Sequence, residues 1–133
     1  MARVLTFRDR ALQSRDAVEL IAQKWRITIL HLLRNEPLRT SELQAAISEI
    51  SPKVLTETLR AMERDGLISR KVHAVVPAHV EYALTAMGSS LLQPLQDLCH
   101  WARAHVQERD EARARFDAAA PAKMPVRRSA TKP

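Results

Sequence analysis

The sequence predicts a mainly α-helical domain that carries one small β-hairpin. Apolar residues recur at intervals of three and four over most of residues 14–105, which is typical of amphipathic helices. Residues 67–85 differ, because they contain two short stretches of strand-forming residues around a loop. A chain of 133 residues has room for a single domain of about 100 residues with its tails.

The central helix should begin at Pro52 and end before Gly66. Ser51 is a good N-cap, and Pro52 fits the first helical position because its missing N–H would have no intrahelical partner there. Gly66 suits the left-handed position that follows a helix. The apolar residues of this segment share one face, so the opposite, polar face is left exposed. They are Leu55, Leu59 and Met62.

Three further helices are expected before this one. The first begins at about Ser14 and leads to Trp25, and the second covers the strongly apolar stretch to residue 33, with Trp25 as a core residue. After a break at Pro37, a short third helix begins at Thr40 and ends near Ile47. Two short helices joined by a turn at residues 48–50, the second with a polar outer face, form the helix-turn-helix pattern.

The hairpin that follows should have arms at 67–72 and 79–85, joined by residues 73–78. Its first arm is basic, and the second alternates so that one face lies on the core. A capped helix followed at once by a basic strand is the arrangement of a winged helix-turn-helix domain. The hairpin and its loop would then be the wing.

The last helix, which Thr85 should cap, carries a broad apolar seam. Pro94 should kink this helix or mark a fresh start. The seam could pack on the first helix of the same chain, but its width favours a second copy of the chain as its cover. The residues expected at this dimer interface are Leu12, Leu91, Leu95, Leu98, Trp101 and His105.

The chain therefore divides into an N-terminal arm (1–13), a central domain with its flanking helices (14–110) and a basic tail (111–133). The arm could pack on a partner subunit or form a frayed lead-in. The tail has little to bury, and disorder is expected from about Ala118.

The net charge of +6 resides in the tails, because residues 16–106 hold ten basic and ten acidic side chains. Overall charge therefore supports a polyanionic partner only weakly. The sequence holds no apolar run long enough for a membrane span and no signal peptide, and its single cysteine, Cys99, cannot form an internal disulfide. A cytoplasmic protein is expected, with Cys99 as a small packed hydrophobe rather than a reactive thiol.

No motif of the sequence indicates an enzymatic activity. None of the five histidines is spaced with cysteines or carboxylates as metal ligands are, and two glycines cannot form a phosphate-binding loop. Neither a metal nor a cofactor is predicted.

Five ordered blocks resemble the HxlR-type family of bacterial transcription regulators. They are Lys24-Trp25 with the apolar helix after it, residues 38–43, residues 50–56, Leu59 to Ile68, and residues 80–85 with Gly88. The resemblance covers about residues 14–105. It implies a winged helix-turn-helix homodimer, joined through its first and last helices, that binds a pseudo-palindromic operator on double-stranded DNA and controls a nearby promoter. We expect a repressor associated with the nucleoid.

Two positions depart from the family pattern. Redox-sensing members have Cys-Pro fourteen residues before the tryptophan, where this chain has Ala11-Leu12, so that thiol switch is missing here. The family often has Pro-Arg where this chain has Ala78-His79, so one basic contact to DNA would be weaker or depend on pH.

The resemblance places a recognition helix at Pro52–Arg64 and the wing at about 70–79. On that helix we expect base-edge contacts in the major groove from the first turns. Glu57 could accept from cytosine or be a local partner of Lys53 or Arg60. The wing and the start of the third helix should contact phosphates or the minor groove. The predicted DNA-binding residues are Arg39, Thr40, Ser41, Ser51, Lys53, Val54, Thr56, Glu57, Arg60, Arg70, Lys71, His73 and His79.

The alternative is a winged helix that serves as a protein–protein interaction module without sequence-specific DNA recognition, because a fold does not fix a function. An exposed acidic or apolar recognition face would favour it, and Glu57 and Glu63 point slightly that way. The basic residues of the same face and of the wing favour DNA. A small-molecule effector is compatible with either interpretation.

Overall fold

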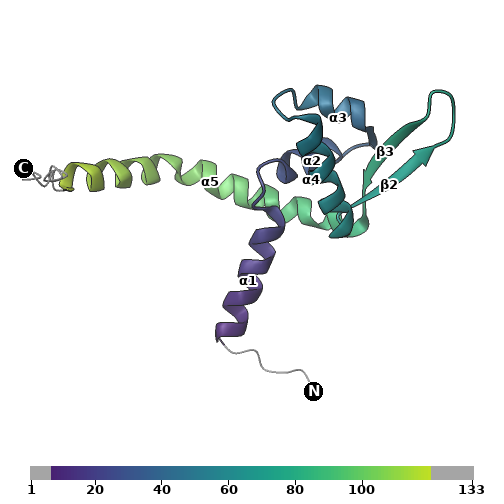
Figure 1. Cartoon of the computed structure of the whole chain (residues 1–133). Helices are drawn as coiled ribbons and strands as arrows, with labels where there is room; N and C mark the ends of the chain where they lie inside the picture. Colours follow the sequence, from purple (N-terminus) through teal and green to yellow (C-terminus); the bar gives the residue numbers. More distant parts are fainter. Residues whose placement is uncertain (1–6, 121–133) are drawn as a thin grey trace, which may run out of the picture. The chain divides into compact units, whose positions relative to one another are not determined.

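The computed structural model describes residues 7–120 (Figure 1). The described residues form two compact units, the first ending at Gln96 and the second beginning at Asp97. Five helices and three short strands form the described part. They are α1 (Phe7–Ile21), α2 (Arg26–Leu32), β1 (Leu38–Arg39), α3 (Thr40–Ala46), α4 (Pro52–Arg64), β2 (Ile68–His73), β3 (His79–Leu84) and α5 (Ala86–Ala119). This order confirms the predicted fold class, a mainly helical winged helix-turn-helix.

The three strands form one antiparallel sheet in the order β1-β3-β2. The β2–β3 hairpin is in register from Ile68 opposite Leu84 to His73 opposite His79, so its loop covers residues 74–78. Its arms agree with the predicted ones to within one residue. β1 adds Leu38 opposite Tyr82 on the other side of β3. The sequence predicted these two residues to be extended, but a two-residue strand carries no alternation that would place it in a sheet.

The core of the first unit lies between α2, α3, α4, the hairpin and the start of α5. The predicted apolar face of α4 is confirmed, since its three apolar residues are fully buried. Trp25 packs against this core, as predicted. The largest fully buried side chains are Ile29, Leu30, Leu43, Leu55, Leu59, Met62, Ile68 and Leu95.

The end of α4 and the start of α5 meet at two glycines. Gly66 follows α4 with φ of +76°, the left-handed conformation that the sequence predicted. Thr85 caps α5, because its Oγ1 accepts from the Gly88 N–H (3.0 Å) and donates to the Gly66 carbonyl (2.6 Å). Gly88 is buried where a Cβ would overlap the Leu67 carbonyl oxygen. The hairpin is therefore fixed against the first turn of α5.

Both ends of the chain are more helical than predicted. α1 begins at Phe7 rather than near Ser14, and α5 continues through Pro94 to Ala119, so residues 111–119 are helical and there is no fresh start at the proline. Residues 10–13 and 111–119 contain good helix formers and neither glycine nor proline, which explains both extensions. The rest of the predicted tail, residues 121–133, and the side chain of Leu12 lie outside the described part.

Between residues 7 and 120, none of the helices is both long enough and apolar enough to cross a membrane.

Candidate nucleic-acid interface

The N-terminal half of α4 presents a polar face. Ser51 Oγ accepts from the Val54 N–H at 3.2 Å, which confirms the predicted cap, and Pro52 occupies the first turn. Leu55, Leu59 and Met62 point into the core, so the opposite side of the helix is free of packing. Five predicted site residues are exposed on that side: Lys53, Val54, Thr56, Glu57 and Arg60.

The turn between α3 and α4 is held by buried groups. Ile47 and Ile50 are 4% and 3% exposed, and the Ile50 N–H donates to the Ile47 carbonyl at 3.2 Å. Gln44 Nε2 donates to the Ile50 carbonyl at 2.6 Å, and so ties α3 to the residue before the cap of α4. Sequence reasoning missed Gln44, because only the fold shows that this amide reaches the turn.

Two polar side chains on α4 differ in what they offer to a ligand. Thr56 Oγ1 donates to the Pro52 carbonyl at 2.9 Å, so its methyl group and oxygen lone pairs remain for an outside partner. Glu57 forms no ion pair with Lys53 or Arg60 within residues 7–120. The local ion pair, which was one of the two roles considered for Glu57, is therefore absent.

The basic residues of β2 lie on opposite faces of the hairpin, because successive strand side chains alternate. Arg70 is opposite Tyr82, and its Nε lies 3.7 Å from Glu63 Oε1 at the end of α4. Lys71 is exposed and opposite Glu81. Burial raises the pKa of the Tyr82 phenol above its ordinary value, while the positive charge of Arg70 opposes this rise. Arg70 is thus partly engaged by α4, and Lys71 is not.

His73 and His79 lie in a more enclosed setting than a phosphate contact would need. Both are half-buried, and their rings stack with centroids 4.6 Å apart and an interplanar angle of 17°. His73 Nε2 lies 3.5 Å from Glu81 Oε1. We call these three residues the wing cluster. The sequence shows no metal-ligand spacing among these residues, and only the hairpin pairing brings them together from two strands.

The third group of predicted residues lies at the start of α3. Arg39 and Ser41 are exposed, and Thr40 is half-buried. Glu42 Oε2 accepts from the Arg39 N–H at 3.0 Å, which satisfies one of the free donors at this helix end.

The predicted dimer residues on α5 fall into two groups. Leu95 is 1% exposed within the core of its own chain, and Leu91 packs against that core. Leu95 is therefore wrong as an interface residue, because its side chain has no surface left for a partner. In the second unit, Leu98 and Trp101 are 52% and 59% exposed, and Cys99 is half-buried.

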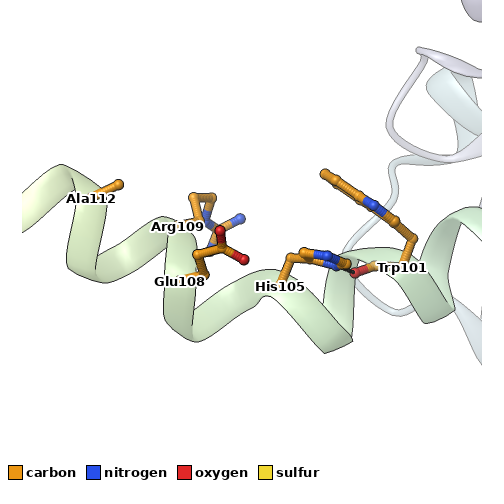
Figure 2. A pocket seen from close by; sticks show the side chains of 5 residues that line it. All are labelled: Trp101, His105, Glu108, Arg109 and Ala112. Carbon is orange, nitrogen blue, oxygen red and sulfur yellow. Dashed lines mark hydrogen bonds between the residues drawn. The ribbon is translucent and has the colours of Figure 1, made fainter.

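A hollow on α5 is built around Trp101. Figure 2 shows its lining side chains along one stretch of the helix: Trp101, His105, Glu108, Arg109 and Ala112. The His105 ring stacks on the indole at 4.7 Å, and His105 Nδ1 donates to the Trp101 carbonyl at 2.8 Å. The indole is thus held in place although most of it is exposed.

A tightly held turn, a capped second helix with a polar outer face and an adjoining basic hairpin define a winged helix-turn-helix protein of the DNA-binding class. The HxlR-like helix-turn-helix family model matches residues 20–110, and the chain belongs to this family. It is a transcription regulator of the helix-turn-helix type.

Curated relatives support the same assignment. The chain is 41% identical over 106 residues to YkvN of Bacillus subtilis, an uncharacterized HTH-type transcriptional regulator, with 80% of this chain and 89% of YkvN covered. It is 35% identical over 105 residues to YtfH of Escherichia coli, also an uncharacterized HTH-type regulator, with 76% and 83% covered.

Solved structures agree in fold. One is a regulator assigned to the MarR family from Enterococcus faecalis, with a TM-score of 0.71, 34% identity and coverage of 83% of this chain and 99% of the other. Another is the reduced form of YodB from B. subtilis, with a TM-score of 0.62, 29% identity and coverage of 74% and 92%.

Proposed function

We propose that the protein is a homodimeric repressor that binds a two-fold operator on double-stranded DNA. The exposed face of α4 is the observation that carries this proposal. Its cap, its buried stripe and the tight turn before it together leave Lys53, Thr56 and Arg60 exposed, at positions from which a helix in the major groove contacts base edges.

Base recognition is assigned to the first turns of α4, which is the recognition helix of this proposal. Lys53 offers a donor suited to guanine, and the Thr56 methyl group suits the methyl of thymine. Glu57, which lacks an ion pair with its basic neighbours on α4, offers an acceptor for cytosine. Ser51, Val54 and Arg60 complete the set.

Contacts to the DNA backbone are assigned to the wing and to the start of α3. Lys71 is the strongest candidate because it is exposed, whereas Arg70 shares its charge with Glu63. Such contacts orient the protein but carry no sequence information. Arg39, Thr40 and Ser41 complete this group, whereas the half-buried, stacked rings of His73 and His79 are less available to phosphates.

Dimerisation is assigned to α5. Leu98, Trp101 and Val106 leave large apolar areas exposed on this helix, and such areas are typical of an interface that is covered in the assembled protein. A two-fold dimer would present two recognition helices to two half-sites. Repression is the simplest consequence, because a dimer seated on a promoter blocks access by the polymerase.

The test is a fluorescence-anisotropy titration of DNA from upstream of the protein's own gene against scrambled DNA of equal length and composition. Lys53→Ala combined with Arg60→Ala should remove the preference for the natural sequence. Arg103→Ala, which removes one exposed charge from α5, is the control. Equal affinity of the wild type for both DNAs would contradict the proposal.

A further inference from the structure

The wing cluster has the composition of a metal site. His73 and His79 are directly opposite each other at the last pair of the hairpin, and Glu81 lies two residues further along the same face of β3. One ligand atom from each residue lies within 4.8 Å of the others. The three side chains come from both strands, so an ion held by them would connect the strands next to the wing loop.

Each of the two imidazoles has a nitrogen atom that could bind a ligand. His73 Nε2 is buried and has no hydrogen-bond partner within residues 7–120, an arrangement that is costly for a polar atom. His79 Nδ1 lies 3.4 Å from the Pro77 carbonyl. If Nδ1 carries the proton, Nε2 of His79 is free to bind a metal, as is usual for metal-ligating histidines.

We propose that the wing cluster binds a divalent transition-metal ion of the zinc class through His73, His79 and Glu81. Two imidazoles and one carboxylate suit Zn²⁺ or Co²⁺, with a fourth position open to water, whereas Mg²⁺ and Ca²⁺ prefer oxygen ligands. Tetrahedral bonds of about 2.1 Å place ligand atoms about 3.4 Å apart, so small side-chain rotations would close the site.

The charges around the site limit its affinity. Arg39 on β1 and Lys71 on β2 are each directly opposite Glu81, and their positive charges repel a cation and attract the same carboxylate. All three ligands are therefore needed to hold the ion. Binding also requires that the coordinating nitrogen of each imidazole carries no proton.

Loading would act on DNA binding, an effect that rests on the proposed function. The ion adds positive charge beside the wing loop and restrains that loop, which covers residues 74–78. Both changes favour contact with phosphates, so the metal-loaded protein should bind DNA more tightly than the metal-free protein.

The experiment uses untagged protein of full length. Zn²⁺ binding is measured by equilibrium dialysis, and Co²⁺ is added separately because its visible absorption reports tetrahedral coordination. We expect one ion per chain in the wild type and in His100→Ala, which removes an exposed histidine from α5. His73→Ala, His79→Ala and Glu81→Gln should each weaken binding at least about tenfold. Circular dichroism confirms that each variant is folded.

Absence of binding in the wild type, or equal binding in folded cluster variants, would overturn the metal site. The affinity for DNA is then measured once in the presence of Zn²⁺ and once in the presence of a chelator. We expect a several-fold higher affinity with Zn²⁺. Equal affinity in both conditions would overturn the effect on the wing. Failure to bind any DNA with preference would contradict the proposed function but leave the dialysis result standing, so the two failures are distinguishable.

Discussion

The Arg26 guanidinium donates to Asp65 Oδ2 across 2.6 Å, and this ion pair joins the start of α2 to the residue that ends α4. Arg26 is 5% exposed and also donates to the Leu20 carbonyl and to Gln23 Oε1. The C-terminal end of α4 is thus anchored to α2 by a buried charge. Nothing in the spacing of the sequence identified Arg26 as buried.

Replacement of Asp65 by alanine should lower the free energy of unfolding by about 3 kcal/mol, because it leaves the Arg26 charge buried without its counter-ion. Arg26→Met, which keeps the apolar stem but removes the charge, should lower the free energy of unfolding by less than Asp65→Ala does. Urea denaturation measures both, with Arg64→Ala, at an exposed position on α4, as the control. A decrease below about 0.5 kcal/mol for Asp65→Ala would show that the ion pair is dispensable.

Gly88→Ala should destabilise the protein although alanine is the better helix former. The added Cβ would overlap the Leu67 carbonyl oxygen, so the hairpin or α5 must move. We expect a destabilisation of about 3 kcal/mol from this overpacking, against a gain of about 1 kcal/mol in helix propensity. Thermal unfolding measures the balance, and the exposed neighbour Ser89→Ala serves as the control. A net stabilisation would mean that α5 does not pack on the hairpin as described.

Tyr82 provides a test of pH dependence. Because burial raises the pKa of its phenol, the unfolded chain ionises first as the pH rises through about 10, and stability should fall from there up to the folded pKa. Tyr82 is the only tyrosine, so the near-ultraviolet absorbance of phenolate reports on this residue alone. As the pH rises above about 10, the free energy of unfolding of Tyr82→Phe should therefore decline less steeply than that of the wild type. An ordinary phenol pKa in the native protein would refute the burial argument.

The sequence predicted the parts of this fold that local chemistry determines. The Ser51 cap, the Gly66 end, the apolar stripe of α4 and the Thr85 cap all follow from neighbouring residues, and each was confirmed. The pairing of Arg26 with Asp65 depends on how distant elements meet. Such contacts could not be predicted from spacing, and the same is true of the wing cluster.

Leu95 shows the limit of pattern reasoning on one helix. It shares the apolar seam with Leu98 and Trp101, yet it lies in the first unit and is buried by its own chain. Periodicity identifies an apolar face but does not tell whether the chain itself or a partner covers it. Burial divides the seam, and only its C-terminal part is left for a proposed interface.

Trp101→Asp should convert the dimer into a monomer that stays folded, because the exposed indole belongs to the proposed interface. Leu95→Asp should instead unfold the first unit, since it places a charge in the core. Sedimentation velocity and circular dichroism distinguish these results. His100→Asp adds the same charge at an exposed neighbouring position as a control. A wild-type monomer at micromolar concentration would contradict the two-half-site proposal.

The sharpest test of DNA recognition separates base contacts from phosphate contacts. Lys53→Ala and Thr56→Ala should each relax the preference at particular operator positions, by about 1–3 kcal/mol where a good base contact is removed, and should leave affinity for scrambled DNA nearly unchanged. The neutral charge of residues 16–106 makes this measurable, since no surplus of charge in that span obscures it.

Lys71→Ala should behave differently, because a phosphate contact carries no sequence information. Removal of this side chain should weaken binding to operator and scrambled DNA alike and make the salt dependence shallower by about one unit of slope. Arg70→Ala should have a smaller effect, since Glu63 lies 3.7 Å from the Arg70 guanidinium and offsets its charge. Titrations of each variant at several salt concentrations provide the measurement. If Lys53→Ala and Lys71→Ala lowered both affinities equally, α4 would contribute only charge, and sequence recognition would have to reside elsewhere in the protein.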